Sequence, residues 1–314
     1  MDASKLAIVF PGQGSQSVGM MQGYGDLPEV REVLALASDV LKQDMAKLMD
    51  EGPAEELNRT VNTQPVMVTA GYAAYRAWIA LGGQEPAMLA GHSLGEYTAL
   101  VAAGVLSFAD CLPLVRLRAR AMQEAVPEGA GAMAAILGLD EAKVVEACAA
   151  AAEGEVVEAV NFNAPGQVVI AGHAAAVKRG VDAAKARGAR RAIMLPVSAP
   201  FHSSLMAPAA LKLREALSKV EVRAPRIPVI HNVDAAQRPT PEGVREALCS
   251  QADHPVKWSQ CIGAMADAGL MRVFECGPGK VLAPLSSRIR SSLQGLALCD
   301  RAGLDQGLKV LAES

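Results

Sequence analysis

The amino-acid sequence predicts an α/β fold with a parallel sheet, and short continuous apolar runs separated by helical patterns are the main observations behind this prediction. Continuous apolar runs are typical of strands that are buried on both faces. The first run covers residues 6–10 and stops at Pro11 and Gly12. Similar runs at residues 87–90, 228–230 and 272–275 predict three further strands of the same sheet.

Helical periodicity occupies the segments between these runs. We expect helices at residues 29–49, 65–81, 111–126 and 208–220. Because strands and helices alternate along the chain, the expected core is a parallel sheet with helices packed against it.

Residues 129–197 follow a different pattern. Apolar runs at residues 132–137, 167–171 and 192–195 are separated by two helical segments. This compact β-α-β-α-β order, bounded by turn residues, predicts a small subdomain of the split βαβ type inserted into the larger one. We place the large domain at residues 1–127 and 198–314 and the small subdomain at residues 128–197.

Composition excludes several classes of function. The chain has 30 basic and 33 acidic residues, a net charge of −3 and no long basic run, so nucleic acid is not an expected partner. The longest uncharged apolar stretch, residues 97–109, is too short to span a membrane. Residues 1–5 have no signal-peptide pattern, and we therefore expect a cytoplasmic protein.

The cysteines indicate neither a metal site nor a disulfide framework. None of the six forms a C-x-x-C pair, and they are scattered at Cys111, Cys148, Cys249, Cys261, Cys276 and Cys299. We expect free buried thiols and no bound metal.

A candidate nucleophile stands at Ser93. Residues 91–95 match G-x-S-x-G, with a predicted strand before them and a helical run after them. This context is typical of a nucleophile elbow, in which flanking glycines let the backbone turn sharply and the helix N-terminus offers amides to a negative oxygen. The alternative is an ordinary tight turn.

A nucleophilic serine needs a base, and the sequence offers five histidines. His202 is favoured because it lies between the end of a predicted strand and the start of a helix, where the catalytic crevice of a parallel sheet forms. His231 and His254 remain alternatives. His92 is expected to point away from Ser93, and His173 is expected in a surface turn.

Arg118 occupies an unusual position for a charged side chain. It lies on the apolar face of the predicted helix, whereas Arg116 and Arg120 lie on the opposite face. A buried guanidinium needs an anion, which can be an internal carboxylate or the carboxylate of a substrate. In the second case the acyl group would carry its own acid.

Taken together, these segments resemble malonyl-CoA:acyl carrier protein transacylase of bacterial type II fatty-acid synthesis. The resemblance covers essentially the whole chain, and its motifs are residues 10–16, 91–96, 161–167, 200–202 and 275–280 together with Arg118. A competing dinucleotide-loop interpretation of residues 11–14 is weak, because the third glycine expected at position 17 is Ser17.

The resemblance implies a large α/β-hydrolase-like domain, a small ferredoxin-like insertion and specific residue roles. Ser93 would be the nucleophile, His202 its base and later acid, and Arg118 the ligand of the malonate carboxylate. The backbone carbonyl of Gln251 would orient the histidine. The backbone amides of Gln13 and Leu94 would form the oxyanion hole.

The same resemblance implies a reaction and its partners. A malonyl group would pass from malonyl-CoA to the phosphopantetheine thiol of holo acyl carrier protein, by a ping-pong mechanism through a malonyl-serine ester and without a cofactor. Phe201 and His254 differ from some bacterial members of the family. Candidates for a basic docking patch are Lys185, Arg187, Arg190, Arg191, Lys280, Arg288 and Arg290. Alternative functions are a serine thioesterase or lipase-like hydrolase and a non-catalytic docking module.

Overall fold

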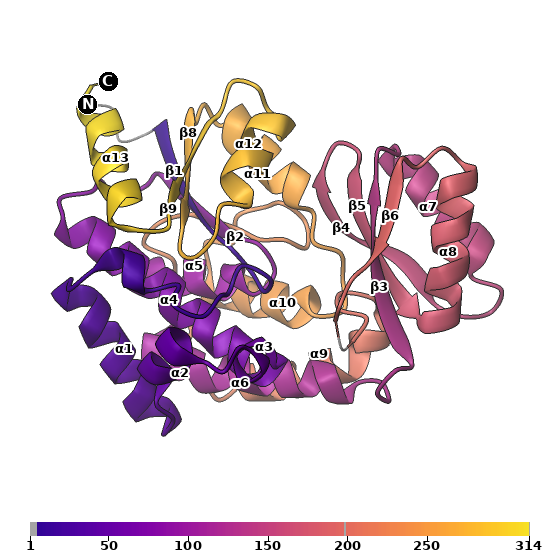
Figure 1. The fold of residues 1–314 in the computed structure, drawn as a ribbon, viewed down its shortest axis with the longest axis horizontal. Coiled ribbons are helices and arrows are strands. Elements are labelled where there is room, and N and C mark those ends of the chain that lie inside the picture. Colours follow the sequence, from indigo (N-terminus) through magenta and orange to yellow (C-terminus); the bar gives the residue numbers. More distant parts are fainter. Residues whose placement is uncertain (1–4, 198, 314) are drawn as a thin grey trace.

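A computed structural model describes residues 5–197 and 199–313, and Figure 1 shows its two sheets side by side. Residues 1–4, which were used for the signal-peptide expectation, and residue 198, which was placed at a domain boundary, lie outside the described residues. The larger sheet has five parallel strands in the order β7-β2-β1-β8-β9. They are β1 (Leu6–Phe10), β2 (Met88–Gly91), β7 (Val229–Ile230), β8 (Arg272–Cys276) and β9 (Gln294–Leu298). The expected parallel sheet is confirmed, and β9 is a strand that the sequence analysis missed.

The central strand β1 is buried along its whole length, which explains its continuous apolar run. Ile8 pairs with Leu89 on one side and with Phe274 on the other. Successive side chains of a strand point to opposite faces, so Leu6, Ile8 and Phe10 join one core while Ala7 and Val9 join a second.

Helices cover both faces of this sheet. The first core is closed by α1 (Pro28–Leu41), α2 (Met45–Glu51), α3 (Ala54–Asn58), α4 (Thr60–Ala80), α5 (Gly95–Ala102), α6 (Phe108–Glu124), α9 (Ala207–Leu217), α10 (Pro241–Gln251) and α13 (Arg301–Ala312). The second core is closed by α11 (Trp258–Asp267) and α12 (Leu282–Ile289). Short 3-10 turns lie at η2 (Gln22–Tyr24) and η3 (Ser204–Met206).

Several predicted helix bounds were wrong. The single helix expected at residues 29–49 is two helices, because Lys42 adopts a left-handed conformation and Asp44 caps the second helix. Helix α4 begins five residues before Pro65, which therefore lies inside it. Helix α6 begins at Phe108 because the Ser107 side chain accepts a hydrogen bond from the amide of Asp110. Helix α9 ends at Leu217, three residues before the predicted end.

The second sheet is antiparallel, with the order β4-β5-β3-β6. Its elements follow the chain as β3 (Gly131–Leu137), α7 (Glu141–Ala151), β4 (Val157–Ala164), β5 (Gln167–His173), α8 (Ala174–Ala186) and β6 (Arg191–Met194). This βαββαβ arrangement is ferredoxin-like, as expected, but its four strands include β4, which the three-strand prediction missed. The subdomain bounds of 128–197 stay a prediction.

All six cysteines are free, as expected, and five are buried, whereas Cys299 is partly exposed. No helix in the described parts of the chain is both long enough and apolar enough to cross a membrane.

Candidate active site

Ser93 lies at the sharp turn between β2 and α5. Its φ of 51° is in the left-handed region that non-glycine residues rarely adopt. The glycines on either side are sterically required. A Cβ on Gly91 would lie 1.9 Å from the carbonyl of Gly95, and one on Gly95 would lie 2.2 Å from the carbonyl oxygen of Phe10. The G-x-S-x-G spacing therefore follows from the close passage of the backbone at the elbow.

The imidazole of His202 lies beside the Ser93 hydroxyl. Ser93 Oγ is 2.6 Å from His202 Nε2, and His202 Nδ1 is 2.9 Å from the backbone carbonyl oxygen of Gln251. Because a carbonyl oxygen only accepts, Nδ1 carries the proton and Nε2 presents its lone pair to Ser93. This is the arrangement that a general base requires, with a backbone carbonyl in the place of a carboxylate.

Burial keeps this imidazole neutral. Loss of solvent, and secondarily the positive charge of Arg118, lower the pKa of His202 to about 3. At neutral pH the ring is therefore ready to accept a proton.

Arg118 projects from α6 into the same site and is only 1% exposed. Its Nη1 donates to Gln64 Oε1 at 3.0 Å, and its Nη2 donates to Gln251 Oε1 at 3.0 Å and to Ser93 Oγ at 3.2 Å. Among the described residues these partners are amide and hydroxyl oxygens, and none is a carboxylate. The sequence left two possible partners for Arg118, an internal carboxylate and the carboxylate of a substrate. In the described part of the chain, the internal carboxylate is not found.

Ser93, His202 and Arg118 share a cavity of about 130 Å³. Gln13 and Leu94 also line it, and within the described chain neither of their backbone amides donates a hydrogen bond. The Ser93 amide, by contrast, donates to Asn232 Oδ1 at 2.7 Å. The remaining lining residues are Gln64, His92, Met122, Met133, Asn161, Leu195, Val197 and Phe201.

The other histidines lie in different surroundings. His92 lines the cavity, which was not expected, and its Nε2 is 2.7 Å from Asn163 Oδ1. His173 ends strand β5, where its Nδ1 accepts from the amide of Val156. His231 is buried against Glu96, and His254 lies at the surface beside Asp253. Of the candidate bases, the structure brings His202 to the Ser93 hydroxyl.

Sequence reasoning missed three polar side chains around the site. Gln64 contacts Arg118, Asn232 holds the Ser93 amide, and Glu96 is buried beneath the elbow. Only Glu96 had a local signal, because it directly follows the G-x-S-x-G motif. The other two come from segments distant in sequence.

Comparison with known proteins adds independent evidence. The family model described as an acyl transferase domain matches residues 7–300. The malonyl CoA-acyl carrier protein transacylase of Escherichia coli is 51% identical over 308 residues, which cover 98% of this chain and 100% of that protein. The transacylase of the same name from Bacillus subtilis strain 168 is 42% identical, with 99% of this chain and 98% of that protein covered.

Solved structures agree with this result. An acyl-carrier-protein S-malonyltransferase from Burkholderia pseudomallei has 58% identity and a TM-score of 0.96, with 97% of this chain and 99% of that chain covered. A malonyl-transacylase in complex with a type II PKS acyl-carrier protein has 47% identity and a TM-score of 0.96, with 98% and 100% covered. Since both the family model and these full-length relatives match, the chain belongs to the acyl transferase family, among the malonyl CoA-acyl carrier protein transacylases.

Proposed function

We propose that this protein transfers a malonyl group from malonyl-CoA to the phosphopantetheine thiol of holo acyl carrier protein, through an ester on Ser93. The observation that carries the proposal is the position of the Ser93 hydroxyl, which lies 2.6 Å from a neutral imidazole and 3.2 Å from a buried guanidinium. A buried cation without a carboxylate partner favours an acyl group that carries its own acid.

In the first half-reaction the malonate carboxylate binds Arg118, and Ser93 Oγ attacks the thioester carbonyl. His202 Nε2 takes the hydroxyl proton, while the Gln251 carbonyl keeps the ring in place. The amides of Gln13 and Leu94 would stabilise the tetrahedral oxyanion, and one such donor is typically worth about 3 kcal/mol. The carbon–sulfur bond then breaks, and His202 gives its proton to the departing coenzyme A thiolate.

The second half-reaction reverses these steps with a different thiol. His202 takes the proton of the phosphopantetheine thiol, whose sulfur attacks the malonyl-Ser93 ester. When the ester bond breaks, His202 gives this proton to Ser93 Oγ. Ping-pong kinetics follow, because coenzyme A leaves before the carrier thiol reacts.

No cofactor is required in this scheme, because the thioester is already an activated acyl donor. In the described residues, no group of histidine, cysteine and acidic side chains could hold a metal ion. We place the protein in the cytoplasm, where its substrates would be made. The basic residues proposed for carrier docking include Lys185 in α8, Arg191 in β6 and Arg288 in α12.

Intact-mass spectrometry tests the proposal directly. The protein is incubated in parallel with malonyl-, methylmalonyl- and acetyl-CoA, and holo acyl carrier protein is then added. We expect a malonyl adduct that disappears as the carrier protein gains the same mass. An adduct lost to water without transfer would favour a hydrolase, and an unchanged mass would favour a docking module.

A further inference from the structure

A fully buried carboxylate lies directly beneath the nucleophile elbow. Glu96 is in the first turn of α5, three residues after Ser93, and its side chain has no exposed surface. Its Oε2 accepts hydrogen bonds from the amide of Asn232 at 2.9 Å and from Gln251 Nε2 at 3.0 Å. Its Oε1 lies 2.7 Å from His231 Nδ1. Three groups therefore converge on one carboxylate, and all three contacts are hydrogen bonds to its oxygens when His231 Nδ1 carries the ring proton.

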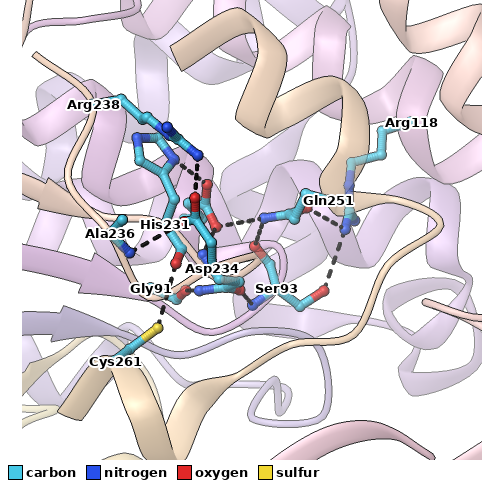
Figure 2. Close-up of polar contacts among 11 residues, drawn as sticks. Gly91, Ser93, Arg118, His231, Asp234, Ala236, Arg238, Gln251 and Cys261 are labelled. Carbon is cyan, nitrogen blue, oxygen red and sulfur yellow. Dashed lines mark hydrogen bonds and ion pairs between the residues drawn. The ribbon is translucent and has the colours of Figure 1, made fainter. Parts of the chain in front are cut away.

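Gln251, the first partner of Glu96, contacts three residues of the site. Its backbone carbonyl accepts from His202 Nδ1 at 2.9 Å, and its side-chain Oε1 accepts from Arg118 Nη2 at 3.0 Å. Its Nε2 also donates to the backbone carbonyl of Ser93 at 2.9 Å. Figure 2 shows Gln251 between Ser93 and Arg118.

Asn232, the second partner, holds the backbone of the elbow. Its Oδ1 accepts from the Ser93 amide at 2.7 Å, and its Nδ2 donates to the carbonyl of Gly91 at 2.8 Å. A serine at a φ of 51° is strained, and such a conformation persists only where its surroundings over-determine it. Hydrogen bonds with the Asn232 and Gln251 side chains are two of the restraints on this conformation.

The charge of Glu96 has a specific effect on the Gln251 amide. A guanidinium only donates and a carboxylate only accepts, so the amide oxygen must face Arg118 and the amide nitrogen must face Glu96. Without an acceptor at Glu96, the Gln251 amide nitrogen would lose one of its two acceptors and keep only the backbone carbonyl of Ser93.

We infer that Glu96 is a positioning residue for acyl transfer, which acts through Gln251 and Asn232 while His231 holds its second oxygen. It touches no reacting atom. The inference rests on the proposed function, since it concerns the rate at which the Ser93 ester forms.

The test is the substitution Glu96→Gln, which keeps the shape of the side chain but replaces an acceptor by an amide that must both donate and accept. Misplacement of catalytic groups by about 1 Å can cost about 100-fold in rate, so we expect ester formation to slow by about 10- to 100-fold. The measurement is single-turnover formation of malonyl-Ser93, followed by intact mass. Because Glu96 does not contact substrate, kcat should fall while KM and the ratio of malonyl to acetyl transfer change little.

Glu275→Gln is the matched control. Glu275 is also fully buried, and its oxygens accept from the amides of Val281 and Ala283, away from the Glu96 network. Both substitutions should lower the unfolding temperature, but only Glu96→Gln should slow the reaction. Equal rates in the two variants would overturn the inference.

A second pair of variants decides the matter if Glu96→Gln does not fold. His231→Asn retains an N–H donor near the position of Nδ1, whereas His231→Phe leaves Glu96 Oε1 without one. We expect the asparagine variant to keep most of the rate and the phenylalanine variant to lose it, and equal rates in this pair would also overturn the inference. If the unsubstituted protein forms no malonyl ester, the proposed function fails instead, so the two failures are distinguishable.

Discussion

The two sheets of this protein bury different kinds of side chain. Around the turn at Ser93, at the end of β2 in the parallel sheet, several polar side chains are each 3% exposed or less: Glu96, Arg118, His202, His231 and Gln251. In the described residues of 128–197, by contrast, no polar or charged side chain is buried. The small sheet is packed against α7 and α8 by aliphatic residues such as Ile136, Ile170 and Val177.

This difference indicates that the two regions contribute differently to catalysis and to stability. A buried polar network is costly unless every member is paired, but once paired it holds its groups in one arrangement. An apolar core contributes stability, but the hydrophobic effect is not directional and does not orient polar side chains. The small subdomain lines one part of the cavity. Its lining residues are Met133 of β3, Asn161 of β4, and Leu195 and Val197, which follow β6. Substitutions in the buried polar network should therefore change the reaction, and those in the apolar core between the small sheet and helices α7 and α8 should change stability.

Ser93→Ala should have the largest effect. Without the hydroxyl no ester can form, and loss of a catalytic serine typically lowers kcat by about 10⁶-fold. Intact mass after incubation with malonyl-CoA measures the result. An adduct that persists would place the nucleophile outside the elbow.

Arg118→Ala should have the next largest effect, and a selective one. A site built to pair a substrate group can reject the analogue that lacks it by about 10⁴-fold, so the unsubstituted protein should strongly prefer malonyl-CoA to acetyl-CoA. In the variant malonyl transfer should fall far more than acetyl transfer. The measurement is kcat/KM for both substrates, and equal losses would contradict the assigned role.

The pH dependence sharpens the contrast between buried and exposed groups. Because burial lowers the pKa of His202 to about 3, its neutral form persists as the pH falls through the ordinary histidine range. We expect the single-turnover rate to change little from pH 7 to about pH 5, well above this pKa. An acid limb at about 6.5, the ordinary histidine pKa, would show that His202 is solvated in the working enzyme.

The same shift has a consequence for stability. The unfolded chain takes up a proton on this histidine below about pH 6.5, whereas the folded chain does not until about pH 3. This group therefore contributes stability that is present above about pH 6.5 and is lost as the pH falls toward 3. Denaturant unfolding at a series of pH values checks the direction.

Ile170→Ala should have the smallest effect on the reaction. Ile170 is 1% exposed in the core between β5 and the helices of the small sheet, and truncation of a buried isoleucine costs about 2–5 kcal/mol of unfolding free energy. At temperatures where the variant is folded, kcat/KM should be unchanged. Val169→Ala is the neighbouring comparison, because Val169 packs with Met133 and Phe201, which line the cavity. A loss of rate in Ile170→Ala comparable to that in Val169→Ala would contradict the division between the two regions.

Much of the fold could be predicted because its signals are local. The buried run of β1 and the elbow at Ser93 each depend on fewer than ten consecutive residues. Strand β4 was missed because it alternates buried residues with partly exposed ones such as Glu158 and Asn161, and β9 was missed because its first residues are exposed. Edge strands carry a weaker apolar signal than central ones.

Two features of the site follow from short stretches of sequence: the glycine-flanked turn at Ser93, where the backbone passes too close for any Cβ, and the position of Arg118 on an apolar helix face. Which histidine reaches the serine, and which groups pair with the arginine, depends on contacts between distant segments. His202 is 109 residues from Ser93, and Gln251 and Asn232 are still farther. These segments meet because of the sheet order β7-β2-β1 and the packing of α6, α9 and α10, and no spacing along the chain encodes such contacts.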